Sequence, residues 1–398
     1  MAYLYHLDFP RKERRILRYF HYLTAEEQQS IFYQSPGSFD RFSDKYLLSH
    51  SLGALLYMPG TRKQIVDDII VKKHRGLISM VLCLEDAIGD NEVLDAENSL
   101  IAQVHQIALL IKNGRLQEED VPLIFIRVRE PEQINRLVNQ LGEHSLYVTG
   151  FVFPKFSSSN GERYFETLIE CNKQINRKLY GMPILESSEI IYKETRVSAL
   201  VEVRNILDKY RDVVLNVRIG ATDFSSLFGL RRNPGITIYD LSVIRDCIAD
   251  IVNMFSRKDS DYVVSGPVWE YFNSTNLPPK TAPLSAFNRN TAVDYEEGLI
   301  REVMLDKENG LLGKTIIHPS HIRAVQSLYV VSHEEYMDAL AIVQKNDGEQ
   351  GVMKSEYANK MNEIKPHLNW SNKILMRANI YGVYHAQNNF TNLLAERI

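Results

Sequence analysis

Short apolar runs alternate with longer segments of helical period along most of the chain. The runs are rich in Val, Ile, Leu and Phe, which is typical of strands buried on both faces of a parallel sheet. In the longer segments apolar residues recur at i, i+3, i+4 and i+7, the spacing of one helix face. The eight apolar runs are 52–59, 77–85, 122–128, 150–156, 180–186, 212–220, 262–266 and 314–319. The clearest helical segments are 94–113, 132–142, 161–175 and 188–210.

This order of elements predicts an α/β fold of the (β/α)8 TIM-barrel class. Eight strands alternating with helices over about 270 residues agree with that fold in number and in size. An open, doubly wound sheet is the alternative. However, no GxGxxG follows the first run to mark the dinucleotide site of such a sheet.

Two segments lie outside the barrel, which we place at residues 46–330. Residues 1–45 form a polar, aromatic N-terminal extension, whose helical piece we expect to cap the bottom of the barrel. Residues 331–398 form a C-terminal helical, lid-like appendage. In it, Ser332 and Glu335 have the S-x-x-E spacing of a helix-capping box.

Composition narrows the class of protein. The chain has 398 residues, of which 44% are hydrophobic and 24% charged, as in soluble globular proteins and unlike disordered ones. A net charge of −4 without a basic segment argues against nucleic acid and against a polybasic membrane surface. No stretch of 18 apolar residues occurs, and Asp8 and Pro10 interrupt the N-terminus before an export signal could form.

The three cysteines suggest a reducing compartment. Cys83, Cys171 and Cys247 lie far apart and form no CxxC pair. Neither a disulfide framework nor a structural zinc site is indicated. We therefore expect a cytoplasmic protein.

Polar residues that close the apolar runs are the first candidates for chemistry. In a TIM barrel the active site lies at the carboxyl ends of the strands, so these side chains would share one rim. The residues in question are Glu85, Asp86, Arg127, Arg129, Lys155, Glu186, Asp223 and His318.

Glu186 and Asp223 close adjacent strands and suggest a magnesium site. Mg²⁺ takes one or two protein carboxylates and leaves its other positions to water and an oxygen-rich substrate such as a 2-oxo acid. Zinc is less attractive, since no His/Cys cluster is near. The alternative is that each carboxylate caps the helix that follows its strand.

Arg127 offers a planar fork to a carboxylate or to an enolate oxygen whose charge develops during carbon–carbon cleavage. The alternative is a structural ion pair with Glu85 or Asp86. Arg129, two residues further on, would share the same strand face, so either arginine could meet the substrate.

Lys155 raises a different chemistry. A lysine at a barrel rim can form a Schiff base with a carbonyl substrate if its pKa is lowered. The more ordinary role is that of a charge partner for neighbouring carboxylates. His318, followed by Pro319, is more often a turn histidine than a catalytic base.

Seven blocks of sequence, in this order, resemble the citrate lyase β-subunit-like aldolases. The N-terminal extension and the C-terminal stretch from Gly351 to Val383 resemble one branch of that superfamily, the carbon–carbon bond lyases found in tellurite-resistance-type gene clusters. The blocks are LLYMPG (55–60), MVLCLEDAI (80–88), IRV (126–128), FPK (153–155), PILES (183–187), GATDFSSLFG (220–229) and GKTIIHPSHI (313–322).

The resemblance implies a magnesium-dependent lyase that acts on 3-hydroxy acids or acyl thioesters. It implies that Glu186 and Asp223 hold the metal and that Arg127 binds the enolate. It also implies that Glu85 and Asp86 organise the substrate and the metal-bound waters. In relatives the C-terminal segment often covers a neighbouring subunit's site and can supply an acidic residue. The corresponding position here would be Glu363.

Three positions depart from the pattern of that family. Cys83 stands where an aspartate is usual, Thr222 where an acidic residue is common, and His321 where glutamine is common. The two proposed metal ligands, Glu186 and Asp223, are unaffected by these three departures. The departures therefore concern the identity of the substrate. Coenzyme A use stays open, because no phosphate-binding glycine loop or basic cluster marks a nucleotide pocket.

We therefore expect an Mg²⁺-dependent lyase of retro-aldol or Claisen type that produces or uses a 2-oxo acid. The rival interpretations are a Schiff-base aldolase that uses Lys155 and a barrel that binds a 2-oxo acid without turnover. We also expect a homo-oligomer, either a trimer or a hexamer. The long connection at 273–290 suggests a lid or a contact between subunits.

Overall fold

The computed structural model describes residues 17–272 and 295–394. Its centre is a closed barrel of eight parallel strands, each paired with its neighbours in chain order. The barrel strands are β4 (Ala54–Pro59), β5 (Ser79–Cys83), β6 (Leu123–Arg127), β7 (Val148–Phe153), β8 (Tyr180–Leu185), β9 (Val217–Ile219), β10 (Val264–Trp269) and β11 (Lys314–Ile316). The TIM-barrel prediction is confirmed.

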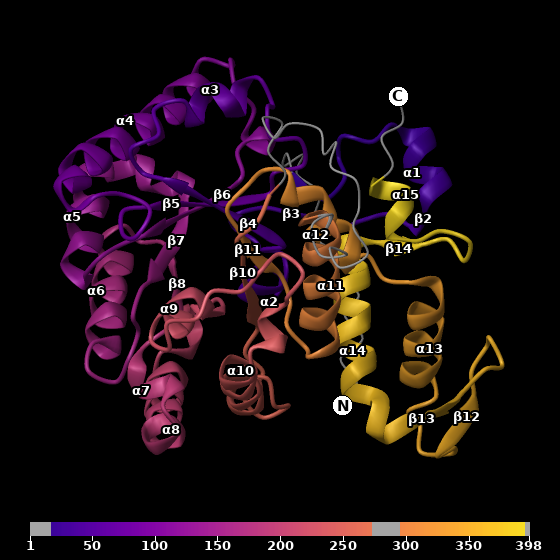
Figure 1. The fold of residues 1–398 in the computed structure, drawn as a ribbon. Helices are drawn as coiled ribbons and strands as arrows, with labels where there is room; N and C mark the ends of the chain where they lie inside the picture. Colours follow the sequence, from indigo (N-terminus) through magenta and orange to yellow (C-terminus); the bar gives the residue numbers. More distant parts are fainter. Residues whose placement is uncertain (1–16, 273–294, 395–398) are drawn as a thin grey trace, which may run out of the picture.

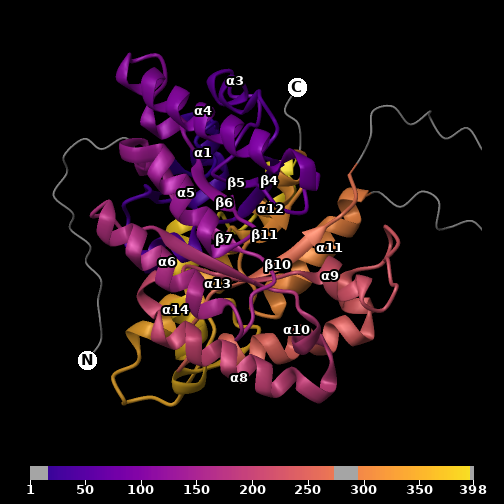
Figure 2. The ribbon, with the colours of Figure 1, turned by 90° about the vertical axis from the view of Figure 1, so that its left-hand side faces the viewer.

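Helices follow the strands and form the outer layer. α4, α5, α6 and α8 lie in chain order around the outside of β5 to β8 (Figures 1 and 2). The helices of the barrel are α3 (Ile65–Ile70), α4 (Val93–Lys112), α5 (Pro131–Leu141), α6 (Gly161–Gln174), α7 (Ser188–Ile191), α8 (Lys193–Lys209), α9 (Ala221–Ser226), α10 (Ser242–Phe255), α11 (Tyr295–Glu308) and α12 (His321–Tyr329).

Three elements differ clearly from the sequence prediction. The sixth strand of the barrel, expected over 212–220, is limited to Val217–Ile219, and Arg211–Val213 form a 3-10 turn instead. The helix expected over 188–210 is divided at Tyr192, whose extended backbone (φ −75°, ψ 130°) separates α7 from α8. The seventh strand continues to Trp269, beyond the predicted end at 266. Its last residues include Pro267, and its register with β11 shifts between Gly266 and Trp269, so the pattern of a regular strand is lost there.

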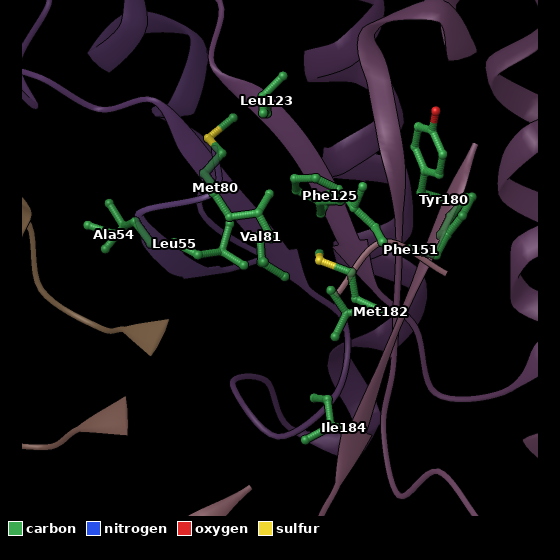
Figure 3. Packing of buried hydrophobic residues seen from close by; sticks show 14 of the residues in the cluster. Ala54, Leu55, Met80, Val81, Leu123, Phe125, Phe151, Tyr180, Met182 and Ile184 are labelled. Atoms are coloured by element: carbon green, nitrogen blue, oxygen red, sulfur yellow. The ribbon is translucent and has the colours of Figure 1, made fainter. Parts of the chain in front are cut away.

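Side chains alternate between the barrel interior and the helical layer, as strand geometry requires. Figure 3 shows Val81, Phe125 and Met182, from β5, β6 and β8, gathered in the interior. All three are buried. The expected connection at 273–290 lies outside the described residues.

The segments on either side of the barrel pair with each other. β1 (Leu17–Arg18) pairs with β3 (Ser38–Phe39), and β2 (Phe32–Gln34) pairs with β14 (Val383–Tyr384) from the other end of the chain. The other helices and strands of these segments are α1 (Ala25–Ile31), α2 (Lys45–His50), α13 (His333–Gln344), β12 (Val352–Lys354), β13 (Met361–Glu363), α14 (Ile364–Tyr381) and α15 (Phe390–Leu394). The capping box of Ser332 and Glu335 is present at the start of α13.

These paired segments cover the amino-terminal end of the barrel. The Tyr19 ring lies 4.4 Å from that of Tyr381, and the hydroxyl groups of both donate to carbonyls just ahead of β4, those of Ser51 and His50. α14 also contacts α2, which precedes β4. Tyr19 of the N-terminal segment therefore lies at the amino-terminal end of the barrel. Within this chain the C-terminal segment lies at that end as well, and not over the carboxyl ends of the strands.

Within the part of the chain that the structure describes, no helix is long and apolar enough to cross a membrane.

Candidate active site

The carboxyl ends of β5 to β9 bring five of the predicted residues together with Asp223. Glu85 and Asp86 follow β5, Arg127 ends β6, and Lys155 lies in the turn after β7. Glu186 follows β8, and Asp223 lies in the first turn of α9, which follows β9. Neighbouring strands of one barrel thus supply four carboxylates and two cations.

Arg127 is the centre of this group. Its Nη2 donates to Asp86 Oδ2 at 3.0 Å and to Glu186 Oε1 at 3.2 Å, and forms an ion pair with Glu85 Oε2 at 2.8 Å. The Arg127 side chain is almost fully buried, and its Nε has no hydrogen-bond partner. Burial lowers the pKa of the guanidinium, but Glu186 and Glu85 outweigh burial, so the pKa is raised and the charge is held. The ion pair with Glu85 and Asp86 is present, and one donor remains for another group.

Lys155 contributes both its backbone and its side chain. Its amide N–H donates to Glu186 Oε1 at 2.7 Å, and its Nζ lies 2.5 Å from Glu85 Oε1 and 3.6 Å from Asp86 Oδ1. The residue has φ +47°, in the left-handed region that non-glycine residues rarely occupy. Such backbone strain often accompanies functional sites, and here it turns the amide toward Glu186.

The protonated form of Lys155 is favoured over its neutral form. Burial lowers the pKa of the amine, but the hydrogen bond to Glu85 and the charges of Glu85 and Asp86 raise it above its ordinary value overall. A Schiff-base lysine needs the opposite shift, because only the neutral amine attacks a carbonyl. The geometry therefore supports the role of charge partner.

Glu186 and Asp223 form a carboxylate pair. Glu186 is buried, and burial, together with the charge of Asp223, raises its pKa to about 7 even though Arg127 opposes the rise. Burial and the charge of Asp86 also raise the pKa of Asp223. Neither side chain caps the helix that follows it, since α7 and α9 begin without a side-chain cap hydrogen bond. The helix-cap alternative is therefore wrong for both residues.

Gly220 sets the position of Glu186. A β-carbon at residue 220 would overlap the Cβ and Oε2 of Glu186, so only glycine fits this close approach. Oε1 of Glu186 is held by Arg127 and Lys155, which leaves Oε2 on the side of Gly220 and Asp223.

The pKa values of the remaining two carboxylates, Glu85 and Asp86, are shifted in opposite directions. Burial and the adjacent Asp86 raise the pKa of Glu85. Burial also acts to raise the pKa of Asp86, but the hydrogen bond to Glu85 and the charges of Arg127 and Lys155 lower it overall. Asp86 is therefore the more acidic of the two and carries the negative charge beside Arg127.

Three predicted residues lie apart from this group. Arg129 lies past the end of β6 and does not share its face; its side chain donates to Leu84 O and to the exposed Asp90. His318 binds Ser320 in the turn after β11, which agrees with a turn histidine. Glu363 ends β13, which packs against α13 and α14 far from the strand ends of the site (Figure 1). Glu363 therefore does not belong to the site of its own chain.

Sequence analysis missed two sets of buried charges. Lys314 is fully buried and bridges Glu302 (2.9 Å) and Asp306 (2.7 Å) of α11, and Glu302 also pairs with Arg232. Arg218, on β9, is buried inside the barrel. The prediction rested on residues that close an apolar run, whereas Lys314 begins its run and Arg218 lies within one. Charged residues inside an apolar run were the signal that could have identified them.

In the described ranges, no group of three or more His, Cys, Asp or Glu side chains has the geometry of a metal site. The candidate metal centre therefore rests on the two carboxylates of Glu186 and Asp223 alone.

Comparison with known proteins places the chain. The model of the protein family described as carbon–carbon bond lyase of the TIM-barrel fold matches residues 46–383. The chain belongs to this family. It is a carbon–carbon lyase, as expected. No protein of curated function matches the sequence significantly.

Solved structures of citrate lyase type share the fold. A citrate lyase from Burkholderia xenovorans LB400 is 13% identical, with a TM-score of 0.59 over 86% of this chain and 96% of that chain. Protein CitE from Mycobacterium tuberculosis, solved with magnesium, acetoacetate and coenzyme A, is 19% identical, with a TM-score of 0.50 over 83% of this chain and 99% of that chain. These two likenesses show that the chain shares the fold of these citrate lyase-type proteins.

Proposed function

We propose that this lyase is Mg²⁺-dependent and cleaves or forms a carbon–carbon bond by a retro-aldol or Claisen route. Its substrate would be a hydroxy acid or a hydroxyacyl thioester, and a 2-oxo acid would be produced or used. The observation that carries the proposal is the position of Glu186. One of its carboxylate oxygens is held by two donors, and the other is left facing the side of Asp223.

The charge and chemistry of the site fit this ion. Four carboxylates against one guanidinium and one ammonium leave a formal charge of −2, which a divalent cation balances. Mg²⁺ prefers oxygen ligands and needs only one or two from the protein, so Glu186 and Asp223 would hold it. Bound there, the ion would supply a Lewis acid for the oxygens of a 2-oxo or hydroxy acid.

Arg127 would stabilise the oxygen that becomes negative when the carbon–carbon bond breaks. Its Nη2 is occupied by carboxylates, but its buried Nε is a charge-bearing donor without a partner. A donor fixed before the reaction and shielded from water stabilises such an oxygen more than water does. Glu85 and Asp86 fix the guanidinium and would organise the substrate and its waters.

Lys155 would help to bind the substrate by keeping Glu85 and Glu186 in place. Its ammonium group neutralises Glu85 and its amide orients Glu186, so one residue positions carboxylates from two strands. Coenzyme A is a candidate thioester carrier, since it is present in the M. tuberculosis CitE structure.

Further proposals concern the whole protein. We keep the expected divisions at 1–45, 46–330 and 331–398, a cytoplasmic location, and a homo-oligomer, trimeric or hexameric. Glu363 could act only at the site of a neighbouring subunit, because in its own chain it lies with the C-terminal helices.

The test is calorimetric titration of metal-stripped protein with pyruvate, glyoxylate and oxaloacetate, with and without Mg²⁺. Mg²⁺-dependent binding that is lost in Glu186→Gln/Asp223→Asn supports the proposal. Glu194→Gln, which changes an exposed carboxylate of α8, is the matched control and should bind as the wild type does. An affinity for these acids that Mg²⁺ does not raise, or a rise with Mg²⁺ that survives the double substitution, contradicts it.

A further inference from the structure

Arg218 is a buried arginine with no carboxylate partner among the described residues. Its relative exposure is 2%, and its hydrogen bonds go to the neutral groups of Thr315, Asn216 and Tyr57. By contrast, Arg127, Arg196 and Arg232 each meet at least one carboxylate. Burial lowers the pKa of Arg218, and no acidic group acts strongly enough to reverse it.

The guanidinium lies inside the barrel. Arg218 pairs through its backbone with Ile184 on β8 and Ser265 on β10. Its side chain reaches Thr315 on β11 and Tyr57 on β4, two and three strands away around the barrel. Only a side chain directed across the interior can make both contacts.

The guanidinium of Arg218 and the neighbouring side chain of Asn216 each have a hydrogen-bond donor without an acceptor. Arg218 Nε and Asn216 Nδ2 are both buried and lack hydrogen-bond partners, and the contact from Arg218 Nη1 to Asn216 Oδ1 is long, at 3.4 Å. An arginine keeps its proton in a protein, so burial without a counter-charge costs several kcal/mol. A planar carboxylate, which accepts two parallel N–H bonds from a guanidinium, is the group that satisfies this arrangement.

The position connects with the candidate active site. The Arg218 guanidinium carbon lies 5.9 Å from the centre of the Tyr57 ring. Burial raises the pKa of Tyr57, while Arg218 and Arg127 both act to lower it. Tyr57 and Thr315 are only half-buried, unlike Arg218. A small molecule that meets these partly exposed side chains would approach the guanidinium from the side that they line.

We propose that Arg218 binds a second carboxylate of the substrate inside the barrel, separately from the carboxylate pair of Glu186 and Asp223. The assignment of this anion as substrate rests on the proposed function. It makes the substrate, or the part of it that enters the barrel, a dicarboxylic acid. The anion site itself requires no metal.

The test uses full-length, metal-stripped protein in chloride-free buffer, with succinate and acetate as probes and succinamide as the neutral analogue. We expect calorimetry to show binding of both acids to the wild type and to Glu186→Gln/Asp223→Asn, and no binding of succinamide. Arg218→Met should weaken binding at least tenfold, since charge-assisted hydrogen bonds are lost. The Glu186→Gln/Asp223→Asn variant lacks the proposed metal ligands. The binding of succinate and acetate to it therefore tests the Arg218 site whether or not the proposed magnesium site exists.

Thermal unfolding gives a second readout. Without ligand, Arg218→Met should unfold at the same or a higher temperature than the wild type, because an uncompensated buried charge is removed. Arg232→Met is the matched control and should unfold at a lower temperature, because it removes one of the two cations that pair with buried Glu302. If Arg218→Met does not fold, Arg218→Lys keeps the charge, loses the planar fork and should still bind more weakly.

Three results would overturn the proposal. These are no binding of either acid to the wild type, equal binding by wild type and Arg218 variants, and displacement of acetate by chloride at equal concentration. The last would show a site for any small anion and not for a carboxylate.

Discussion

Gly220 lies so close to Glu186 that a single added methyl group would meet the Cβ and carboxylate of that side chain. The contact joins the loop after β8 to the start of α9, so the backbone that carries Asp223 also fixes Glu186. The two proposed ligands are therefore positioned as one unit.

Gly220→Ala should impair Mg²⁺ binding and lower kcat/KM by about 10- to 100-fold, because a misplacement of about 1 Å has that effect on catalysis. Calorimetry with Mg²⁺ and a rate measurement check this. Gly351→Ala, where an added methyl group meets nothing, is the control and should leave both values unchanged. If Gly220→Ala binds Mg²⁺ with unaltered affinity, Glu186 is not a ligand of the metal.

Asp223→Asn should reduce the rate by about 100-fold or more, since transition-state charge stabilisation of several kcal/mol is lost. Steady-state kinetics at saturating Mg²⁺ provide the measurement, with Glu194→Gln as the control. Full activity in the variant would be incompatible with a metal held by this carboxylate.

Arg127→Gln should destabilise the protein by about 3–5 kcal/mol, because buried Glu85 and Glu186 lose their common counter-charge. Arg129→Gln should change stability by no more than about 1 kcal/mol, since Arg129 pairs with a carboxylate that is 91% exposed. Urea unfolding of both variants tests the contrast. Equal losses would mean that the three-carboxylate contact of Arg127 contributes little.

Borohydride treatment with pyruvate should leave the mass of the protein unchanged, because neighbouring carboxylates raise the pKa of Lys155 and keep it protonated. Lys155→Met, analysed in parallel, identifies any adduct at another lysine. A reduced adduct that is present in the wild type and absent from Lys155→Met would restore the Schiff-base mechanism.

Glu335 should make stability depend on pH below neutrality. Burial acts to raise its pKa, but Arg377, Lys307 and the Ser332 cap lower it to about 2. An unfolded glutamate titrates near pH 4.3, so the folded state gains stability above that pH and loses it as the pH falls toward 2.

Glu335→Gln should therefore lower the free energy of unfolding by about 2 kcal/mol at pH 7 and by much less at pH 2. Denaturant titrations at the two pH values provide the comparison. Glu349→Gln, which alters an exposed carboxylate, should show no such difference. A deficit that is the same at both pH values would rule out the charge of Glu335 as its cause.

The barrel and the rim of the site could be predicted from sequence for one physical reason. Parallel strands buried on both faces need continuous apolar runs, and residues at their carboxyl ends must converge on one rim. Glu85, Arg127 and Glu186 were found by that rule, and the structure brings both carboxylates within hydrogen-bonding distance of Arg127.

What the sequence could not supply depends on contacts between distant positions. The pairing of β2 with β14 joins residues 32–34 to 383–384, and no local pattern encodes it. The location of Glu363 follows from where α14 packs, which the capping and helix signals do not determine. Arg218 was missed because one charge inside a run of Val, Leu and Ile does not say which face of the strand it occupies.

The two flanking segments pair with each other at the amino-terminal end of the barrel, whereas the candidate active site lies at the carboxyl end. Folding and substrate specificity therefore depend on opposite sides of the molecule. Substitutions at the amino-terminal end act on folding, where Tyr19, Tyr381 and their neighbours join the ends of the chain to the barrel. Loops on the opposite side can diverge toward new substrates while that anchorage is kept. The architecture thus makes this lyase a favourable starting point for laboratory evolution of specificity.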